Sequence, residues 1–430
     1  MTGYVRKKLD AYQPDVPTGK EDTVNTRRFD SKVSRKDREL LRTLAEKWAE
    51  AAALPVQEER RREWWRHNNL EPGRPLIHCV VNDAWREFWK LEAEDQQLRN
   101  VEWLLRNNVY ASKLSSDFPL SRSFFVGYVY SNSDFGMPVP THSVREGGSY
   151  NWDPPLKDLA DFHKLVPGVE VDLEASENDR QALDDIFGDI LQIKYAPNSK
   201  YAPSLDSLAI MLRGMNQLML DMCDEPGFVH ELMSFLRDQV VACCRRMEQK
   251  GQLQSSEEDL FWSCSSLVDG CDEGHVRLVN QSTDQNGQGF TGISPDMFDE
   301  FVFPYQQDIM EMFGASRYGC CEPLHHWLDT ILRVKNLRKV NVTPWSDLDI
   351  CAEKLRSHGG VMVTRKVHPN TVGLERFDPA EIESELRRVV RTCKGLRLEL
   401  FLVDQGTVNH QPDRLRQWCE IARKVVEDEE

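Results

Sequence analysis

The chain has 430 residues, enough for two domains or for a single α/β barrel with insertions. Its 70 acidic residues against 54 basic ones give a net charge of −16, which excludes a general nucleic-acid binder because such a protein presents a basic surface. No apolar run approaches the roughly 20 residues that cross a bilayer. Residues 1–36 lack the apolar segment of a secretory signal, and the 11 cysteines lack the spacing of a disulfide scaffold. We therefore expect a soluble, reduced, cytoplasmic protein with no nucleic-acid or membrane partner.

Residues 1–74 predict an arm followed by a helical extension. The first 34 residues are charged and contain Pro14 and Pro17, so we expect them to lie as an arm over the body or over a neighbouring subunit. Helical patterns then run from 34 to 48 and from about 57 to 67. The second contains a basic and aromatic run, which we interpret as a solvated helix face with two tryptophans packed inward. The arm and this extension, attached to an acidic body, lead us to expect a homodimer.

Residues 75–430 predict strands that alternate with helices. Apolar runs bounded by turn residues predict strands at 75–82, 123–130, 261–267, 275–280, 339–343, 361–364 and 398–403. Helical periodicity predicts helices at 85–105, 206–222, 227–250, 295–313, 347–357, 379–392 and 412–426. Residues 131–180 are rich in Pro, Gly and Asp, and we interpret them as a long segment over the mouth of the barrel, either a lid or an insertion. The alternation predicts an α/β fold, a TIM-type (β/α)8 barrel with an N-terminal helical extension, and the lack of a Gly-x-Gly-x-x-Gly loop argues against a Rossmann enzyme.

The stretch 316–329 gathers chemically active side chains where a strand gives way to a helix. Cys320, Cys321 and Glu322 stand there beside His325 and His326. In a barrel of alternating strands and helices, catalytic residues collect at this kind of junction. Thiolate, carboxylate and imidazole are also the ligands that zinc takes. We therefore expect a catalytic or metal-binding site here, with Glu322 in either role.

Polar residues follow other predicted strands as well. A strand end needs polar turn residues in any case, so each of these taken alone is more often structural than catalytic. As a set along one rim they predict a site for a small molecule. The predicted catalytic residues among them are Tyr128 and Asn280, and the predicted substrate-binding residues are Asn82, Tyr130, Gln281, Arg365 and His368.

Three segments resemble the uroporphyrinogen decarboxylase superfamily, which includes the methylcobamide:coenzyme M methyltransferases. They are 212–221 (LRGMNQLMLD), 224–229 (DEPGFV) and 293–305 (ISPDMFDEFVFPY). The resemblance runs from about residue 206 to 423, roughly half of the chain. The N-terminal 75 residues have no counterpart in it, and the Arg-rich signature of true uroporphyrinogen decarboxylases is missing. The resemblance implies a TIM-type barrel.

The resemblance also implies a zinc-binding active site, and this chain departs from the superfamily pattern at two positions. The methyltransferases carry a zinc-binding His-x-Cys motif, onto which Cys321 matches as the cysteine and Gly319 stands in place of the histidine. The last strand of the superfamily ends in Gly-His-Gly or Gly-Cys-Gly, and here Gln405 precedes Gly406 at that position. Zinc would then need substitute ligands near Cys321, and the candidates are Cys320, Glu322, Asp404 and His410. Asp404 and Gln405 are predicted catalytic residues as well.

The function that the resemblance implies is transfer of a methyl group from a small methylated substrate to a corrinoid. The chain has no cobalamin-binding Asp-x-His-x-x-Gly segment, so the corrinoid would arrive on a partner protein. Zinc would assist by polarising the substrate oxygen. Two alternatives stay open: a metal-independent decarboxylase or lyase on the same scaffold, and a binding protein that has lost catalysis.

Overall fold

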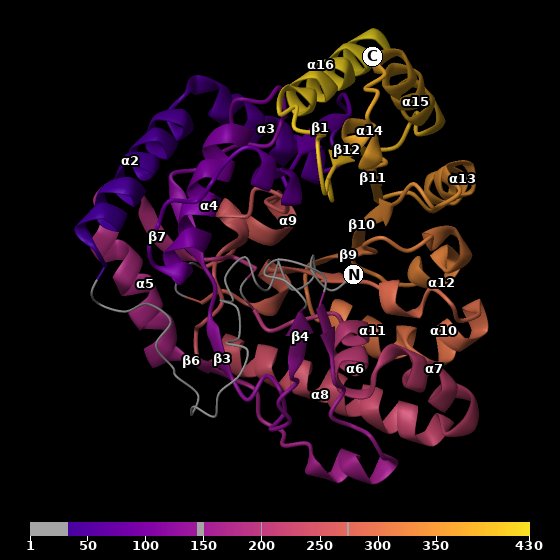
Figure 1. Cartoon of the computed structure of the whole chain (residues 1–430). Coiled ribbons are helices and arrows are strands. Elements are labelled where there is room, and N and C mark those ends of the chain that lie inside the picture. The colour runs from indigo at the N-terminus through magenta and orange to yellow at the C-terminus, as the bar shows by residue number, and fades with distance from the viewer. Residues whose placement is uncertain (1–32, 144–149, 199, 273–274) are drawn as a thin grey trace.

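The computed structural model of the chain describes residues 33–143, 150–198, 200–272 and 275–430. The predicted arm, residues 1–34, lies almost entirely outside this range. The described part is an α/β protein in which helices surround a curved parallel sheet (Figure 1). None of its helices is long and apolar enough to cross a membrane.

The main sheet has six parallel strands in the order β1-β12-β11-β10-β9-β8. In chain order they are β1 (Leu76–Cys79), β8 (Ser282–Gln285), β9 (Ala315–Tyr318), β10 (Leu337–Val342), β11 (Met362–Lys366) and β12 (Leu398–Leu402). Three further pairs of strands form small sheets: β2 with β7 in parallel, and β3 with β6 and β4 with β5 antiparallel. Their bounds are β2 (Ser123–Val126), β3 (Val129–Ser131), β4 (Thr141–Ser143), β5 (Tyr150–Trp152), β6 (Glu170–Asp172) and β7 (Gln192–Tyr195).

The closed eight-stranded barrel that we predicted is not seen among the described residues. The main sheet ends at β1 on one side and at β8 on the other, and β2 and β7 pair only with each other. At the β1 edge, the Ile77 N–H donates to the Asp117 carboxylate at 2.7 Å, and the Asp117 N–H donates to the Ile77 carbonyl at 2.7 Å. An irregular segment before β2 therefore takes the hydrogen bonds that a neighbouring strand would otherwise make at this edge.

The longer helices follow one another around the outside of the sheet (Figure 1). They are α2 (Arg35–Ala52), α3 (Pro55–Asn68), α4 (Gln96–Ala111), α5 (Leu173–Phe187), α6 (Leu205–Arg213), α7 (Met215–Asp224), α8 (Pro226–Gln249), α10 (Pro295–Phe301), α11 (Phe303–Met310), α13 (Leu348–His358), α15 (Pro379–Thr392) and α16 (Asp413–Asp428). Short helices are α9 (Ser265–Val268), α12 (Leu328–Ile331) and α14 (Asn370–Gly373).

Several predicted elements differ from the structure in ways that have a local cause. The helix predicted at 206–222 is broken into α6 and α7 at Gly214, whose φ of 83° lies in the left-handed region. The strands predicted at 261–267 and 275–280 are wrong. The first region contains α9 and the second ends in a 3-10 turn, Leu278–Asn280. Their apolar residues suit a buried strand equally well, because short apolar runs do not distinguish helix from strand.

Alternation along β10, β11 and β12 gives the sheet one apolar and one polar buried face. Val340, Val363 and Leu400 belong to the main hydrophobic core beneath the surrounding helices. The residues next to them in sequence point the other way, because successive side chains of a strand alternate. On that inner face lie buried polar side chains: Lys339, Asn341, Thr364, Lys366 and Glu399. The buried charges of Lys339, Lys366 and Glu399 must therefore be paired with other groups on this inner face.

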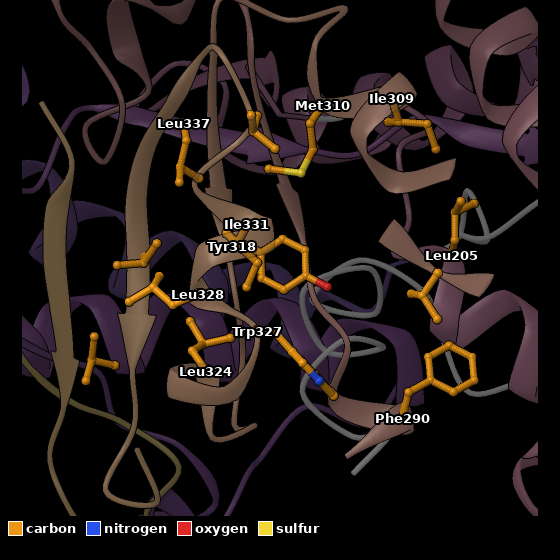
Figure 2. Close-up of a cluster of buried hydrophobic side chains, with 14 of the residues drawn as sticks. Leu205, Phe290, Ile309, Met310, Tyr318, Leu324, Trp327, Leu328, Ile331 and Leu337 are labelled. Carbon is orange, nitrogen blue, oxygen red and sulfur yellow. The ribbon is translucent and has the colours of Figure 1, made fainter. Parts of the chain in front are cut away.

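The helix-side core beneath β9 is built from large side chains. Tyr318, Trp327, Leu328 and Ile331 lie together among other buried apolar side chains (Figure 2). The hydroxyl of Tyr318 donates to Gln306 Oε1 at 2.6 Å, which satisfies the one polar group that this ring buries. This packing fixes the end of β9 and hence the start of the segment 319–322.

A buried ion pair occupies the inner face near the amino ends of the strands. Lys339 Nζ lies 2.8 Å from Glu399 Oε1 and 3.9 Å from the centroid of the Phe261 ring. The other Glu399 oxygen accepts from Thr364 Oγ1 at 2.6 Å, and His67 of α3 lies 3.3 Å from Oε1. Burial alone would raise the pKa of Glu399, but the Lys339 ammonium and the His67 ring outweigh burial and hold that pKa well below its usual range.

This pair generates a stability prediction. Because the pKa of Glu399 is depressed in the folded state, its stabilising contribution is present above the unfolded value of about 4.3 and is lost as the pH falls below it. We expect Glu399→Gln to lower the free energy of unfolding by about 3–5 kcal/mol at pH 7, since it leaves the Lys339 ammonium without its carboxylate. The deficit should shrink below about pH 4.

Urea unfolding of both proteins across this pH range measures the effect. Asp329→Asn is the matched control, because Asp329 forms a surface ion pair with Lys354 and is 79% exposed. That change should cost less than about 1 kcal/mol. Equal losses in the two variants would contradict the assignment of Glu399.

Candidate active site at the carboxyl ends of the strands

Three strands of the main sheet bring chemically active side chains to one edge. Cys321 follows β9, Lys366 is the last residue of β11, and Asp404 follows β12. Because these strands are parallel, their carboxyl ends lie at the same edge, which is where open α/β sheets bind ligands. The three side chains meet there.

The Lys366 ammonium is the centre of the cluster. Its Nζ lies 2.6 Å from Asp404 Oδ2 and 3.3 Å from Cys321 Sγ, and it donates to the Cys320 carbonyl at 3.0 Å. The lysine side chain is 4% exposed, whereas that of Asp404 is 28% exposed. A buried ammonium thus rests against a carboxylate and a thiol at the rim of the sheet.

The two adjacent thiols differ in their environments. Cys320 Sγ and Cys321 Sγ lie 3.7 Å apart, and Cys320 is the more buried of the two. The hydrogen bond from Cys320, together with the Lys366 ammonium, lowers the pKa of Cys321 against the opposing effects of burial and of Asp404. Donation to Cys321, with burial, raises the pKa of Cys320 well above its usual value. The two thiols therefore differ, and Cys321 is the one that ionises more easily.

Residues that follow β1 and β12 hold Asp404 in place. Asp404 has a φ of 67°, a left-handed conformation that a residue with a side chain rarely adopts. Its backbone N–H donates to Asn82 Oδ1 at 2.8 Å, and the Asn82 N–H donates to Gln405 Oε1 at 3.3 Å. Asn82, Asp404 and Gln405, all predicted as site residues, are therefore brought together, with Asn82 and Gln405 acting on the site through Asp404.

Glu322 has a positioning role in the structure. Its carboxylate accepts the N–H of Gly287 at 2.9 Å and the N–H of Cys320 at 2.8 Å, and the side chain is buried. Burial raises the pKa of Glu322 although these two donors oppose it. The carboxylate ties the loop after β8 to the turn that carries the two thiols.

The side chains predicted to bind zinc do not converge on a metal position. Among the described residues, no three His, Cys, Asp or Glu side chains come close enough to hold an ion. Both Glu322 oxygens are taken by backbone donors, His410 is exposed in the loop after β12, and Lys366 already contacts Cys321 and Asp404. In the described residues Lys366, and not a set of three metal ligands, therefore lies between Cys321 and Asp404.

The backbone at Gly319 leaves no room for the histidine that the resemblance would place at position 319. Its φ of 104° is left-handed. A Cβ at this position would lie 2.9 Å from Leu324 Cδ1 and 3.3 Å from both Cβ and the carbonyl oxygen of Asn341. A histidine at 319 would thus require the turn to change shape.

Two of the predicted residues lie at the opposite end of the sheet. Asn280 and Gln281 precede β8, which begins at Ser282, so they stand at its amino end and not after a strand as predicted. Asn280 Nδ2 donates to the Leu267 carbonyl at 3.2 Å, and the Gln281 amide donates to the Gln254 carbonyl. Both side chains brace loops beneath the sheet.

Four other predicted residues make contacts away from the thiols. Tyr128 donates to the Gln252 carbonyl at 2.8 Å, and burial raises its pKa to about 12. Tyr130 lies in β3 with its hydroxyl 3.5 Å from Met247 Sδ. Arg365 faces the helices and donates to the Thr343 carbonyl at 2.5 Å, because it alternates with Lys366. His368 Nδ1 accepts from the Asn370 N–H at 3.2 Å.

Lys366 is the site residue that the sequence reasoning missed. The strand predicted at 361–364 ends two residues early, so Lys366 fell in the following turn. The alternation of polar and apolar residues along β11 does indicate where Lys366 points. Thr364 and Lys366 share a face in a strand of period two, and that face is the polar one.

The cluster predicts how Cys321 reacts with pH. Lys366→Met removes the cation beside the thiolate, so the pKa of Cys321 should rise and its alkylation by iodoacetamide should shift to higher pH. Mass spectrometry of digested protein, quenched across pH 6–10, resolves Cys321 from the exposed Cys223. Lys354→Met, a change at a surface pair, is the control and should leave the profile in place. An unchanged profile in Lys366→Met would contradict the assignment, provided that its thermal melt shows a folded protein.

No protein-family model and no curated protein matches this chain. Among solved structures, the chain is similar to a methyltransferase from Methanosarcina mazei, with a TM-score of 0.48 and 11% sequence identity over 85% of this chain and 97% of that chain. A likeness at this level establishes neither family nor substrate nor reaction.

Proposed function

We propose that this protein is a methyltransferase in which the Cys321 thiolate takes a methyl group from a small methylated substrate. The observation that carries this proposal is the contact of Lys366 Nζ with both Cys321 Sγ and Asp404 Oδ2 at the carboxyl edge of the sheet. A thiolate beside a fixed cation is a strong nucleophile at neutral pH. The resemblance of 212–221 and 293–305 to the uroporphyrinogen decarboxylase superfamily, which includes corrinoid-linked methyltransferases, suggests a methyl group as the cargo.

The charge of the cluster favours a cationic methyl donor. The Cys321 thiolate and the Asp404 carboxylate carry two negative charges, and the Lys366 ammonium carries one positive charge. The excess negative charge attracts a methylated ammonium or sulfonium compound. In the reaction, the bond between sulfur and the methyl carbon forms while the bond from that carbon to nitrogen or sulfonium sulfur breaks. The electron pair leaves with a neutral amine or sulfide, so no proton has to be supplied.

One partner of this reaction remains as a proposal from the resemblance. A reduced corrinoid, carried by a separate protein, would be the final acceptor of the methyl group after the Cys321 sulfur has taken it from the substrate. Zinc has no step in this scheme, because Lys366 already contacts the two side chains that a metal would share. Metal analysis of the purified protein tests this point. A stoichiometric zinc content that falls in Cys321→Ala would contradict the metal-free arrangement.

Methyl transfer is tested with the full-length reduced protein and two probes, trimethylsulfonium and tetramethylammonium, both carrying deuterated methyl groups. We expect the peptide containing Cys321 to gain one labelled methyl group and Cys321→Ser to gain none. Lys366→Met should react more slowly, by up to about tenfold for each unit by which its Cys321 pKa lies above the assay pH, since the thiolate fraction then falls by that factor. Adding cob(I)alamin should remove the label.

Lys354→Met serves as the matched control and should react like the wild type. Label distributed over several cysteines, or equal rates in Lys366→Met and the wild type, would contradict the proposal. A lack of label with both probes would favour the non-catalytic alternative.

A decarboxylase or lyase is the second candidate, and Lys366 itself favours it. A buried lysine at the end of a strand can form an imine with a carbonyl substrate, which serves as an electron sink. Borohydride treatment of the protein with pyruvate would then leave a stable adduct on Lys366. We expect no such adduct, because Lys366 Nζ is already engaged by Asp404 Oδ2 and by the Cys320 carbonyl. Adduct formation on Lys366 would decide for the lyase.

A further inference from the structure

We propose that Cys320 and Cys321 are a modification site for peroxide, at which oxidation joins the two sulfurs in a reversible disulfide. The proposal starts from the distance of 3.7 Å between the two Sγ atoms, which lie on adjacent residues in the turn after β9. It also starts from the position of the Lys366 ammonium, 3.3 Å from Cys321 Sγ. The two sulfurs therefore lie close together, and a cation beside Cys321 favours its ionised form.

The two steps assign a different role to each sulfur. The Cys321 thiolate attacks one oxygen of hydrogen peroxide, the O–O bond breaks, and hydroxide leaves and is protonated to water. The sulfenic acid formed on Cys321 is then attacked by the sulfur of Cys320, which gives up its proton, and the hydroxyl group leaves as a second water. Two electrons pass from the two thiols to one peroxide, and the S–S bond is the product.

Accessibility and strain fit this assignment. Cys321 is half-buried and open to a small oxidant, whereas Cys320 is buried and 6% exposed. The sulfurs have to approach from 3.7 Å to a bond length of about 2.05 Å, and the ring that links adjacent residues is strained. A strained disulfide is more readily reduced than a structural one, which makes the link reversible by a thiol.

The chain contains its own comparison pair. Cys243 and Cys244 are also adjacent, but they lie inside α8, where neighbouring side chains point in different directions. Cys244 Sγ donates to the Tyr201 carbonyl at 3.2 Å, and both residues are buried. Burial raises the pKa of Cys243 to about 11. Both pairs are thus adjacent in sequence, and the turn is the one for which the structure gives an Sγ–Sγ distance of 3.7 Å and a lysine nitrogen 3.3 Å from a sulfur.

The consequence for activity rests on the proposed function. The disulfide removes the nucleophilic thiolate, so the protein should lose methyl transfer in peroxide and regain it with dithiothreitol. The chemical modification is independent of that activity, because it is read by mass. Failure of methyl transfer would leave the disulfide measurable, and failure of the disulfide would leave methyl transfer measurable.

The experiment exposes full-length reduced protein to hydrogen peroxide, blocks remaining thiols with iodoacetamide under denaturing conditions, and maps the peptides by mass spectrometry. We expect the peptide with Cys320 and Cys321 to lose two hydrogen atoms and to carry no alkyl group, while the Cys243–Cys244 peptide is alkylated twice. Dithiothreitol before blocking should restore two alkyl groups on the turn.

Two variants separate the roles. In Cys320→Ser, Cys321 should persist as a sulfenic acid that dimedone traps, and in Lys366→Met, oxidation should slow by about tenfold per unit rise in the pKa of Cys321. Dimedone labelling of Cys321 in the wild type to the same extent as in Cys320→Ser would overturn the proposal. So would linkage of Cys321 to a third cysteine, or equal oxidation of the helical pair. Because the decisive comparison between the two pairs is made within the wild-type chain, it stands even where a variant does not fold.

Discussion

The contact between Lys339 and Glu399 determines which side chains must surround them on the inner face of the sheet. An ammonium and a carboxylate at 0% and 1% exposure are tolerable only when each is paired and its remaining hydrogen-bonding groups are satisfied. Thr364 satisfies the second carboxylate oxygen, the Phe261 carbonyl and ring receive the ammonium, and α3 brings His67 to the same carboxylate. The position of α3 against the sheet is therefore coupled to a charge pair as well as to apolar packing.

The same alternation produces a second buried lysine at the other end of the sheet. Lys366 stands two residues after Thr364 on β11, so it shares the inner face with the ion pair below it. The difference between the two lysines lies in their partners. Glu399 is sealed from solvent, whereas Asp404 is 28% exposed and a thiol completes the contacts of Lys366. One strand face thus carries a sealed ion pair at one edge of the sheet and a partly exposed charged cluster at the other.

The sequence predicted β1, β10, β11 and β12 of the parallel sheet and most of the longer helices, because long periodic segments specify their own type. The helix predicted at 379–392 has the bounds of α15, and the strand predicted at 398–403 is β12 within one residue. Of the site, the turn with Cys321 and the residue Asp404 could be located. Lys366 could not, because the two-residue alternation that places it depends on where β11 ends. The strand at 282–285 was also missed, since its polar sequence, STDQ, carries no apolar signal.

The left-handed turn at Gly319 restricts the mutational routes open to this site. A single substitution to histidine would meet Leu324 and the Asn341 backbone before its imidazole could reach Cys321. The backbone would have to change first, and the Asn341 amide that donates to the Gly319 carbonyl at 2.5 Å holds it in its present shape. A histidine and cysteine pair at 319 and 321 would therefore need several changes together, because the turn would be lost before a ligand was gained. The glycine thus closes this site to change by single substitutions at 319.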